Sequence, residues 1–283
     1  MTSVSSKASK ATMRDLEQNQ IETFKRDGVV LLEGVFDDWI ETLRAGVDRN
    51  MANPGPFGRD YLNDGQSGRF FGDYCNWSRI DEYHQFMFDS PAPAIAARLM
   101  QSDNVRIFHE HVLVKEPGTN QITPWHHDQP YYCVDGRQVC SMWIPLDPVA
   151  IETCPQFIAG SQDWGRWFLP RKFSGIDYDH DDAQLETMPD IDANRDQYDI
   201  RSWSLKPGDA IAFHYLTIHG APANLSDQRR RGFAARWLGD DTKYAKRSGE
   251  ISPPFPGLDE RLQPGDALDT EEFPLVYPRS VNR

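Results

Sequence analysis

The feature that most constrains the fold is a series of short β-rich runs from about position 105 onward, separated by Gly, Pro and Asp turns. Short runs of β-branched and aromatic residues bounded by such turns are typical of strands in all-β domains. We therefore predict a mainly β protein, a sandwich or jelly roll, with early helices flanking it. The runs are VRIF, HVLV, VCSMWIPL, IRSWSL and DAIAFHYL.

The segment before these runs carries helical patterns. Apolar residues at helical spacing end at Gly28, which predicts a first helix followed by the buried strand VVLL. Asp38 and Glu41 have the spacing of a capping box for a second helix with an apolar face over 40–47. Ser90-Pro91 opens a further short helix.

Composition shifts along the chain suggest its organisation. We expect residues 1–12, rich in Ser and Lys, to be a disordered tail, and residues 13–248 to form a single jelly-roll domain. An acidic stretch at about 171–200 is most simply a surface insert. Residues 249–283 form a Pro-rich arm or lid, and the sequence leaves open whether it closes over a site or binds a neighbouring copy in a homo-oligomer.

The net charge of −13 bears on the binding partners. Nucleic acids and anionic membranes attract basic patches, so an acidic chain favours neither, and work on small molecules in solution fits better. No apolar run approaches the roughly 20 residues that span a bilayer, and the N-terminus lacks the apolar middle of a signal peptide. We therefore expect a cytoplasmic protein that acts on a small molecule.

The stretch WHHD at 125–128 is the first candidate metal-binding motif. Alternate side chains of a strand share a face, so His126 and Asp128 can reach one ion while His127 points away. Two protein ligands are too few, and His219, which ends a β-rich run before a Gly turn, is the candidate third. Two histidines and a carboxylate are the facial triad of non-haem Fe(II) oxygenases, which leaves coordination positions open.

Other histidines compete for this role. His180 and Asp182 repeat the H-x-D spacing, but their segment is acidic throughout and lacks strand-like alternation. His214 precedes His219 by five residues, an odd number that places the two on opposite faces of a regular strand. We therefore favour a structural role for His214.

The segments WHHD, SMWIPLDPV and IHGAPANLSDQRRRG, in this order, resemble the phytanoyl-CoA dioxygenase (PhyH-like) branch of the Fe(II)/2-oxoglutarate oxygenases. The opening FKRDGVVLLEGVF and the stretch HVLVKEPG resemble the same family, so the similarity extends over roughly 20–240. The resemblance implies a double-stranded β-helix, a cupin-like jelly roll, with iron held by His126, Asp128 and His219.

The resemblance also implies that 2-oxoglutarate and O2 join Fe(II) in the site. In the family, an arginine about eleven residues after the distal histidine pairs with the far carboxylate of 2-oxoglutarate, and here that position is Arg230. A planar, always charged guanidinium suits this bidentate role. Lys115 and Trp143 stand where relatives bind or line the cosubstrate, with an exposed strand-end lysine and a core tryptophan as the alternatives.

The family resemblance extends to the turn after the distal histidine. Asn224 and Ser226 match the HG-x-x-x-N-x-S signature found there. Ala221 departs from the pattern, because some relatives use a serine at this position to contact 2-oxoglutarate. Cys154-Pro155 replaces the usual N-G or C-G turn, a change that bears on loop shape.

The resemblance implies a dioxygenase that hydroxylates an unactivated C–H of a small organic substrate and releases succinate and CO2. Because Asp128 is present, no ligand position is freed for chloride, and hydroxylation is favoured over halogenation. Nearby polar side chains suit a small polar or amino-acid-like substrate, whereas a CoA thioester needs a basic surface for its phosphates. The candidate substrate residues, each with packing as its alternative, are His109, His111, Gln129, Tyr131, Tyr132, Arg137 and Arg69.

Two other classes of function compete with this one. A cupin-like metal-binding protein without oxygenase activity, an isomerase or a ligand sensor, has no need for a cosubstrate carboxylate clamp, so loss of Arg230 would be harmless there. A noncatalytic binding or scaffold protein would keep its full ligand affinity after metal chelation.

Overall fold

The computed structural model describes residues 16–61, 67–170 and 185–278. The expected tail at 1–12 and the alternative pair His180 and Asp182 lie outside these ranges. The largest sheet of the protein has eight strands. Seven of them follow the order β1-β12-β7-β14-β4-β3-β2, and the eighth, β16, also pairs with β4. This main sheet contains β1 (Val29–Leu32), β2 (Arg59–Asp60), β3 (Phe70–Tyr74), β4 (Val105–Lys115), β7 (Val139–Pro145), β12 (Ala210–Phe213), β14 (Arg230–Leu238) and β16 (Leu275–Tyr277).

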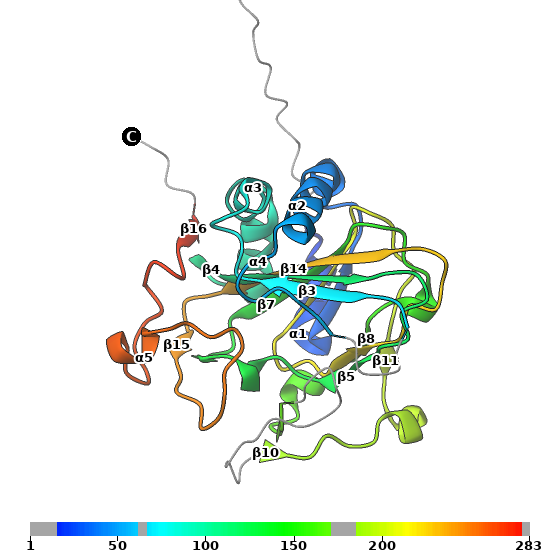
Figure 1. Ribbon diagram of the computed structural model, residues 1–283. Helices are drawn as coiled ribbons and strands as arrows, with labels where there is room; N and C mark the ends of the chain where they lie inside the picture. The colour runs from blue at the N-terminus through cyan, green and yellow to red at the C-terminus, as the bar shows by residue number, and fades with distance from the viewer. Residues whose placement is uncertain (1–15, 62–66, 171–184, 279–283) are drawn as a thin grey trace, which may run out of the picture.

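A smaller sheet of four strands, in the order β11-β8-β13-β5, lies on the other side of the main sheet from the helices (Figure 1). Every strand pair in both sheets is antiparallel, which confirms the prediction of a mainly β jelly roll with flanking helices. The four strands are β5 (Thr123–His126), β8 (Gln156–Ile158), β11 (Ile200–Arg201) and β13 (His219–Ala221). Two further pairs join β6 (Val134–Asp135) to β15 (Lys243–Tyr244) and β9 (Trp167–Phe168) to β10 (Leu185–Glu186).

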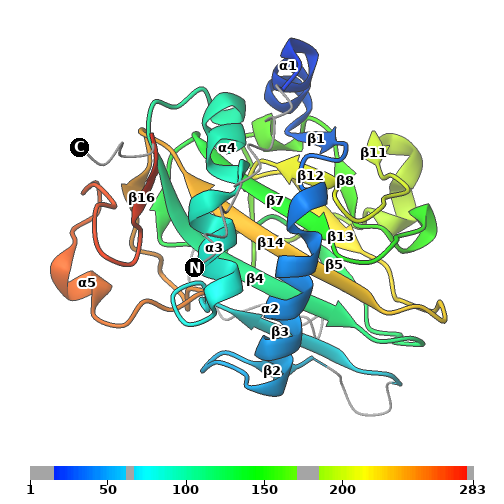
Figure 2. The same ribbon diagram turned by 90° about the horizontal axis from the view of Figure 1, so that it is seen from above.

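Helices cover the outer face of the main sheet, as Figure 2 shows from above. Their apolar sides form one cluster with the outward side chains of β4, β7 and β14, and burial of this apolar surface stabilises the two layers together. The covering helices are α2 (Ile40–Ala52), α3 (Asp81–Asp89) and α4 (Ala92–Met100). Helix α1 (Gln18–Asp27) packs beside β1 and α4 at the edge of the sheet, and α5 (Leu258–Arg261) lies in the C-terminal segment. None of the helices in the described ranges is long and apolar enough to cross a membrane.

Two local predictions need correction. A 3-10 turn at Asp37–Trp39 precedes α2, whose N-cap is Trp39, so Asp38 and Glu41 form no capping box; Glu17 and Gln20 form one at α1 instead. Within the expected surface insert, β10 pairs with β9. Ile191 of the same insert is 1% exposed and packs with Ile158, Phe168 and Ile218, so the described part of the insert is anchored to the domain, although many of its side chains are exposed.

The predicted runs VRIF and HVLV are one strand, β4, interrupted by a bulge at Phe108. The register with β14 steps from His109 opposite Arg236 to Ile107 opposite Trp237, so Phe108 is an extra residue on β4. A bulge of this kind reverses which side chains face which side of the sheet. Ile107 joins the helix-covered core, whereas His109 faces the opposite side.

The C-terminal segment belongs to the same body as the jelly roll. Its β16 pairs with β4 in the main sheet, next to Val105 and Arg106 (Figure 2). Earlier in the segment, the backbone N–H of Ser252 donates to the carbonyl of Tyr131 at 2.8 Å. Residues 250–254, which we term the strap, therefore cross the jelly roll before the chain returns to the sheet edge.

Glu110 is a buried carboxylate on the outer face of β4. It is 0% exposed and accepts hydrogen bonds from the backbone N–H groups of Asn76 and Trp77, which fixes the loop after β3. Burial raises the pKa of Glu110 to about 8, although these hydrogen bonds oppose the shift. The folded protein therefore holds a proton that the unfolded chain has already lost above its ordinary pKa of 4.5.

This shift predicts a pH dependence of stability. Between the ordinary and the raised pKa, the free energy of unfolding should fall with rising pH by about 1.4 kcal/mol per unit from this group, because the folded state binds the extra proton. Glu110→Gln cannot ionise and should lose this part of the slope whatever its absolute stability. Urea denaturation across pH 5.5–7.5 measures both proteins, and equal slopes would contradict the assignment.

Candidate active site

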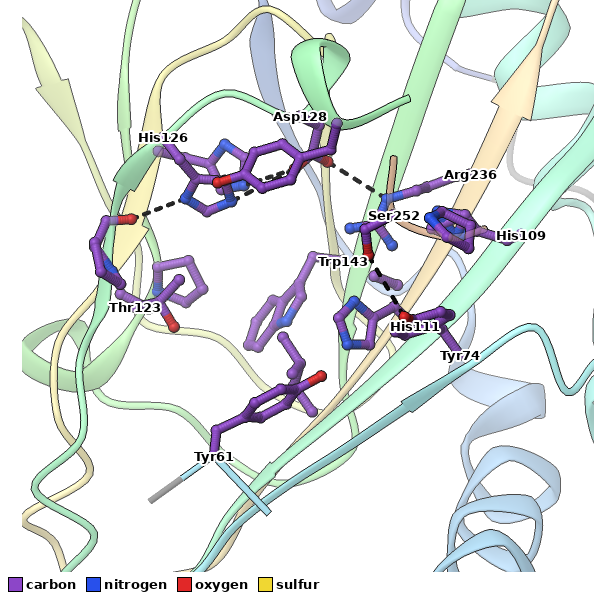
Figure 3. A pocket seen from close by; sticks show the side chains of 18 of the residues that line it. Tyr61, Tyr74, His109, His111, Thr123, His126, Asp128, Trp143, Arg236 and Ser252 are labelled. Carbon is purple, nitrogen blue, oxygen red and sulfur yellow. Dashed lines mark hydrogen bonds and ion pairs between the residues drawn. The ribbon is translucent and has the colours of Figure 1, made fainter. Parts of the chain in front are cut away.

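A cavity of about 560 Å³ lies between the main sheet and the four-stranded sheet. Its floor comes from the inner side chains of β4, β7 and β14, its opposite wall from β5, β8 and β13, and one side from the strap. Pockets that bury drug-sized ligands have volumes of about 300–1,000 Å³. The jelly roll therefore encloses a site of ligand size, and Figure 3 shows the side chains that line it.

The three predicted metal ligands meet at one point of this cavity. His126 ends β5 and pairs across the sheet with His219, which begins β13. The Oδ1 atom of Asp128 lies 3.5 Å from Nε2 of His126 and 3.8 Å from Nε2 of His219. The ligand atoms of the three residues all fall within 4.8 Å of one another, so they could hold a metal ion.

The route by which Asp128 reaches this point differs from the predicted one. The strand ends at His126, and Asp128 has helical backbone angles at the start of a 3-10 turn, so alternation along a strand does not place it. Its backbone N–H donates instead to the carbonyl of Tyr215 at 2.8 Å. The prediction of convergence is right, but the strand geometry assumed for it is wrong.

Backbone carbonyls orient both imidazoles toward the cluster. Nδ1 of His126 lies 2.8 Å from the carbonyl oxygen of Pro124, and Nδ1 of His219 lies 2.9 Å from that of Thr217. Such contacts fix the tautomer in which Nδ1 carries the proton and Nε2 presents a lone pair. Burial is the largest cause that lowers the pKa of His219 to about 3, which keeps it in the neutral form that binds metals.

Arg236 stabilises the carboxylate of the cluster. Its Nε atom lies 3.4 Å from Oδ2 of Asp128, the oxygen turned away from the histidines, and both side chains are buried. Burial alone would raise the pKa of Asp128, but the Arg236 guanidinium and His126 outweigh it and hold this pKa well below its usual value. Asp128 is therefore an anion with one oxygen held by Arg236 and the other directed at the metal position (Figure 3).

Two buried cations stand at the other end of the floor. Arg230 and Lys115 are direct partners on β14 and β4 and are 7% and 1% exposed. Neither side chain has a carboxylate at ion-pair distance within the described ranges; Arg230 donates to the carbonyl of Thr153 and Lys115 to that of Pro222 at 3.1 Å. Burial lowers the pKa of Arg230 to about 10, and burial with the nearby Arg230 charge lowers that of Lys115 well below its usual value.

The turn after β13 holds these cations in place. The amide of Asn224 donates to the carbonyls of Lys115 at 3.0 Å and Gln228 at 2.8 Å, while Ser226 donates to Asn224. The N-x-S signature thus ties the end of β4 to the start of β14. Ala221 and Pro155, the two departures from the family pattern, both line the cavity.

The structure divides the candidate substrate residues into two groups. His109, His111, Tyr131 and Tyr132 line the cavity. Trp143 lines it too and also packs in a buried apolar cluster with Phe157 and Phe213, so it has a core role as well. Gln129, Arg137 and Arg69 do not line the cavity. Gln129 donates to the carbonyl of Gly136 and Arg137 pairs with Asp163, because the chain leaves the strand after His126 and turns away. Arg69, which precedes β3, pairs with Asp60 instead.

His214 has the structural role expected for it, and His127, which was expected to point away from the ion, is structural as well. Nε2 of His127 accepts a hydrogen bond from the backbone N–H of Phe168 at 2.9 Å, and His127 is 3% exposed. His214 accepts from the backbone N–H of Leu216 through Nδ1, and its Nε2 lies 3.0 Å from the carbonyl oxygen of Arg137. Neither lines the cavity.

Several lining residues had not been identified from the sequence. Arg236 carried a signal, because it lies six residues after Arg230 and shares its face of a regular strand. Tyr61, Tyr74 and the strap reach the cavity from distant parts of the chain, so no local sequence pattern predicts that they line it.

Comparison with known proteins relates the chain to one enzyme family. A family model described as phytanoyl-CoA dioxygenase (PhyH) matches residues 24–232. A phytanoyl-CoA dioxygenase of Arabidopsis thaliana is 27% identical over 170 residues, which cover 58% of this chain and 55% of the relative. The chain thus matches little more than half of that protein's length.

Solved structures of similar fold extend over most of the chain. The non-haem α-ketoglutarate-dependent carbocyclase SnoK from nogalamycin biosynthesis superposes with a TM-score of 0.72 at 22% identity, covering 94% of this chain and 98% of that one. The epimerase SnoN in complex with Fe3+, α-ketoglutarate and nogalamycin RO gives 0.70 at 23%, over 91% and 97%. EctD from S. alaskensis with 2-oxoglutarate and 5-hydroxyectoine gives 0.66 at 18%, over 89% and 85%.

The Arg236–Asp128 contact predicts that Arg236 tunes metal affinity. Arg236→Gln removes the charge that orients Asp128 and should weaken Fe(II) binding by roughly 10- to 100-fold, the usual cost of losing such a partner. Anaerobic Fe(II) titration measures the change. Arg231→Gln is the matched control, because Arg231 lies on the same strand and pairs with Asp147 outside the cavity. Equal losses in both variants would contradict the assignment.

Proposed function

Because this chain belongs to the phytanoyl-CoA dioxygenase (PhyH) family, we propose that it is an Fe(II)- and 2-oxoglutarate-dependent dioxygenase that hydroxylates an unactivated C–H of a small organic molecule. One observation carries the proposal: a cavity contains both a two-histidine, one-carboxylate cluster and a buried arginine without a carboxylate partner in the described part of the chain.

The metal cluster fits Fe(II) by its donor set. Two neutral imidazoles and one carboxylate are the ligands of non-haem Fe(II) oxygenases, in which open positions accept cosubstrate and dioxygen. His126, Asp128 and His219 would hold the ion. Bound iron with 2-oxoglutarate and O2 supplies the oxidising power that replaces a C–H hydrogen by hydroxyl, and 2-oxoglutarate leaves as succinate and CO2.

The floor of the cavity fits 2-oxoglutarate. A buried cation without an anion is costly, and a carboxylate arriving at Arg230 would remove that cost and form a bidentate pair. Lys115 stands beside it and can donate to the same carboxylate. A dicarboxylate would thus reach from these cations toward the metal cluster past Trp143 and Ala234, which line the cavity.

The protein's own groups then have distinct tasks. Arg236 holds Asp128 as an anion, the carbonyls of Pro124 and Thr217 keep Nε2 of each histidine free of a proton, and Arg230 binds and orients the cosubstrate. The similar structures that contain 2-oxoglutarate support the choice of cosubstrate. Carbocyclase and epimerase activities in the same fold make the reaction product the measurement that decides for hydroxylation.

A cupin-like isomerase or sensor is the weaker candidate. Such a protein has no use for an additional carboxylate, and it would bury Arg230 and Lys115 at a cost without a ligand to offset it. Their location in the same cavity as the metal cluster favours the dioxygenase.

The proposal predicts a visible charge-transfer band when Fe(II) and 2-oxoglutarate are added to the protein without oxygen. His126→Ala should abolish the band, and Arg230→Ala should raise the 2-oxoglutarate concentration needed for it by at least tenfold, because a buried charge-assisted pair is worth more than about 1.4 kcal/mol. Admission of oxygen should then release succinate.

Arg229→Ala is the control for these variants. Arg229 adjoins Arg230 in sequence, but it is exposed and pairs with Glu116 outside the cavity, so its loss should leave the band unchanged. Absence of the band in folded wild-type protein loaded with Fe(II) would sink the dioxygenase proposal. A product that gains no oxygen atom would refute hydroxylation alone.

A further inference from the structure

The inner face of the main sheet carries a group of buried polar atoms that nothing in the described protein satisfies. They are both ring nitrogens of His109, Nε2 of His111, Nη1 of Arg236 and Oγ of Ser141. Buried polar groups normally have partners, since an unpaired one costs about 1–3 kcal/mol. Unpaired atoms gathered in one place therefore point to a missing ligand.

The sheet register brings these side chains together. Arg236 lies opposite His109 on β4 and opposite Ser141 on β7, and His111 is two residues farther along the same face. His109, His111 and Arg236 line the cavity beside Asp128 (Figure 3). The group is separate from Arg230 and Lys115, which lie at the opposite end of the same strands.

The charges of the group define what it can bind. Burial and the Arg236 charge lower the pKa of His109 well below its usual value, and the same causes lower that of His111 to about 3, so both rings are neutral. Each neutral ring offers one donor and one acceptor, while Arg236 offers donors alone. Such a set accepts a ketone, phenol or carboxylate oxygen, and the guanidinium repels an ammonium group.

The walls next to this group are aromatic. Phe57 and Tyr74 stack in parallel at 4.8 Å, and Tyr74 packs edge-on against His111 at 5.3 Å. Tyr61 lies farther along the same side (Figure 3), and Ile251 and Pro253 of the strap close it. Aromatic faces of this kind favour offset stacking with a planar ring.

From these observations, and resting on the proposed function, we propose that the substrate is a planar aromatic molecule whose ketone or phenol oxygen is bound by His109, His111 and Arg236. Its ring lies against Tyr74 and Tyr61. The cavity volume and the aromatic walls favour such a molecule over the small polar or amino-acid-like substrate expected from the sequence. Ser252 contacts the Tyr74 hydroxyl at 3.5 Å, so the strap covers this subsite.

Binding of a matched pair of probes to the wild-type protein tests the proposal. The probes are 2-acetylnaphthalene, which has a ketone oxygen and no second oxygen with which to chelate iron, and 2-ethylnaphthalene, which has the same ring and a side chain of the same length without oxygen. With Fe(II) and 2-oxoglutarate present and oxygen excluded, equilibrium dialysis should show at least tenfold tighter binding of the oxygenated probe, because two or more hydrogen bonds to otherwise unpaired groups are gained. Equal binding of the two probes, or tighter binding of L-proline, would overturn it.

Variants locate the subsite. His109→Phe and His111→Phe keep a planar ring but remove its nitrogens, and each should reduce the preference for the oxygenated probe by about tenfold. His84→Phe is the matched control, because His84 is exposed on α3 and lies outside the cavity. An unchanged preference in both folded cavity variants would refute the assignment.

The two proposals fail separately. The charge-transfer band reports the metal and cosubstrate, and it should persist in His109→Phe and His111→Phe. Loss of probe discrimination with the band intact would refute the aromatic subsite alone. Absence of the band in wild-type protein that still prefers the oxygenated probe would refute the dioxygenase function and leave the subsite standing.

Discussion

The antiparallel pairing of β14 with β4 and β7 is the constraint on which the rest of the site depends. This register places Arg230 and Arg236 at the two ends of one face, opposite Lys115 and His109. Between the two arginines the strand carries small residues. Gly232 leaves room for the Trp143 ring, because a Cβ added there would lie only 2.4 Å from Nε1 of Trp143. A register slip of one residue would turn both arginines toward the helices, so the pairing that forms the core also determines the chemistry.

The two arginines differ in how the cost of burial is met. Arg236 has Asp128 as a partner within the protein, and the pair gives the metal cluster an oriented anion. Arg230 donates a hydrogen bond to the neutral carbonyl of Thr153 but has no carboxylate partner within the described ranges. Leaving a buried charge uncompensated is unfavourable, so this end of the floor gives up stability for ligand binding. Hydrophobic contacts between the helices and the outer face of the sheet offset that loss.

Local sequence patterns predicted what is local in the structure. Alternation along HEHVLVK, residues 109–115, places His109 and His111 on the face of Lys115, and the ordered family motifs identified the three residues of the metal cluster. Alternation also applied to β14 and would have found Arg236. It failed after His126, where the chain turns and carries Gln129 and Arg137 away from the cavity. The strap could not be anticipated because its position depends on contacts with distant residues such as Tyr131.

The bulge at Phe108 divides β4 into a part that packs in the core and a part that faces the ligand, so mutations in the two parts have different consequences. Upstream of it, Val105 and Ile107 belong to the helix-covered core and hold the C-terminal strand, so changes there affect whether the chain folds. Downstream, His109 and His111 face the ligand while their neighbours carry the packing. A descendant of this chain can therefore acquire a new substrate through alternate positions of half a strand, with the hydrophobic core inherited unchanged.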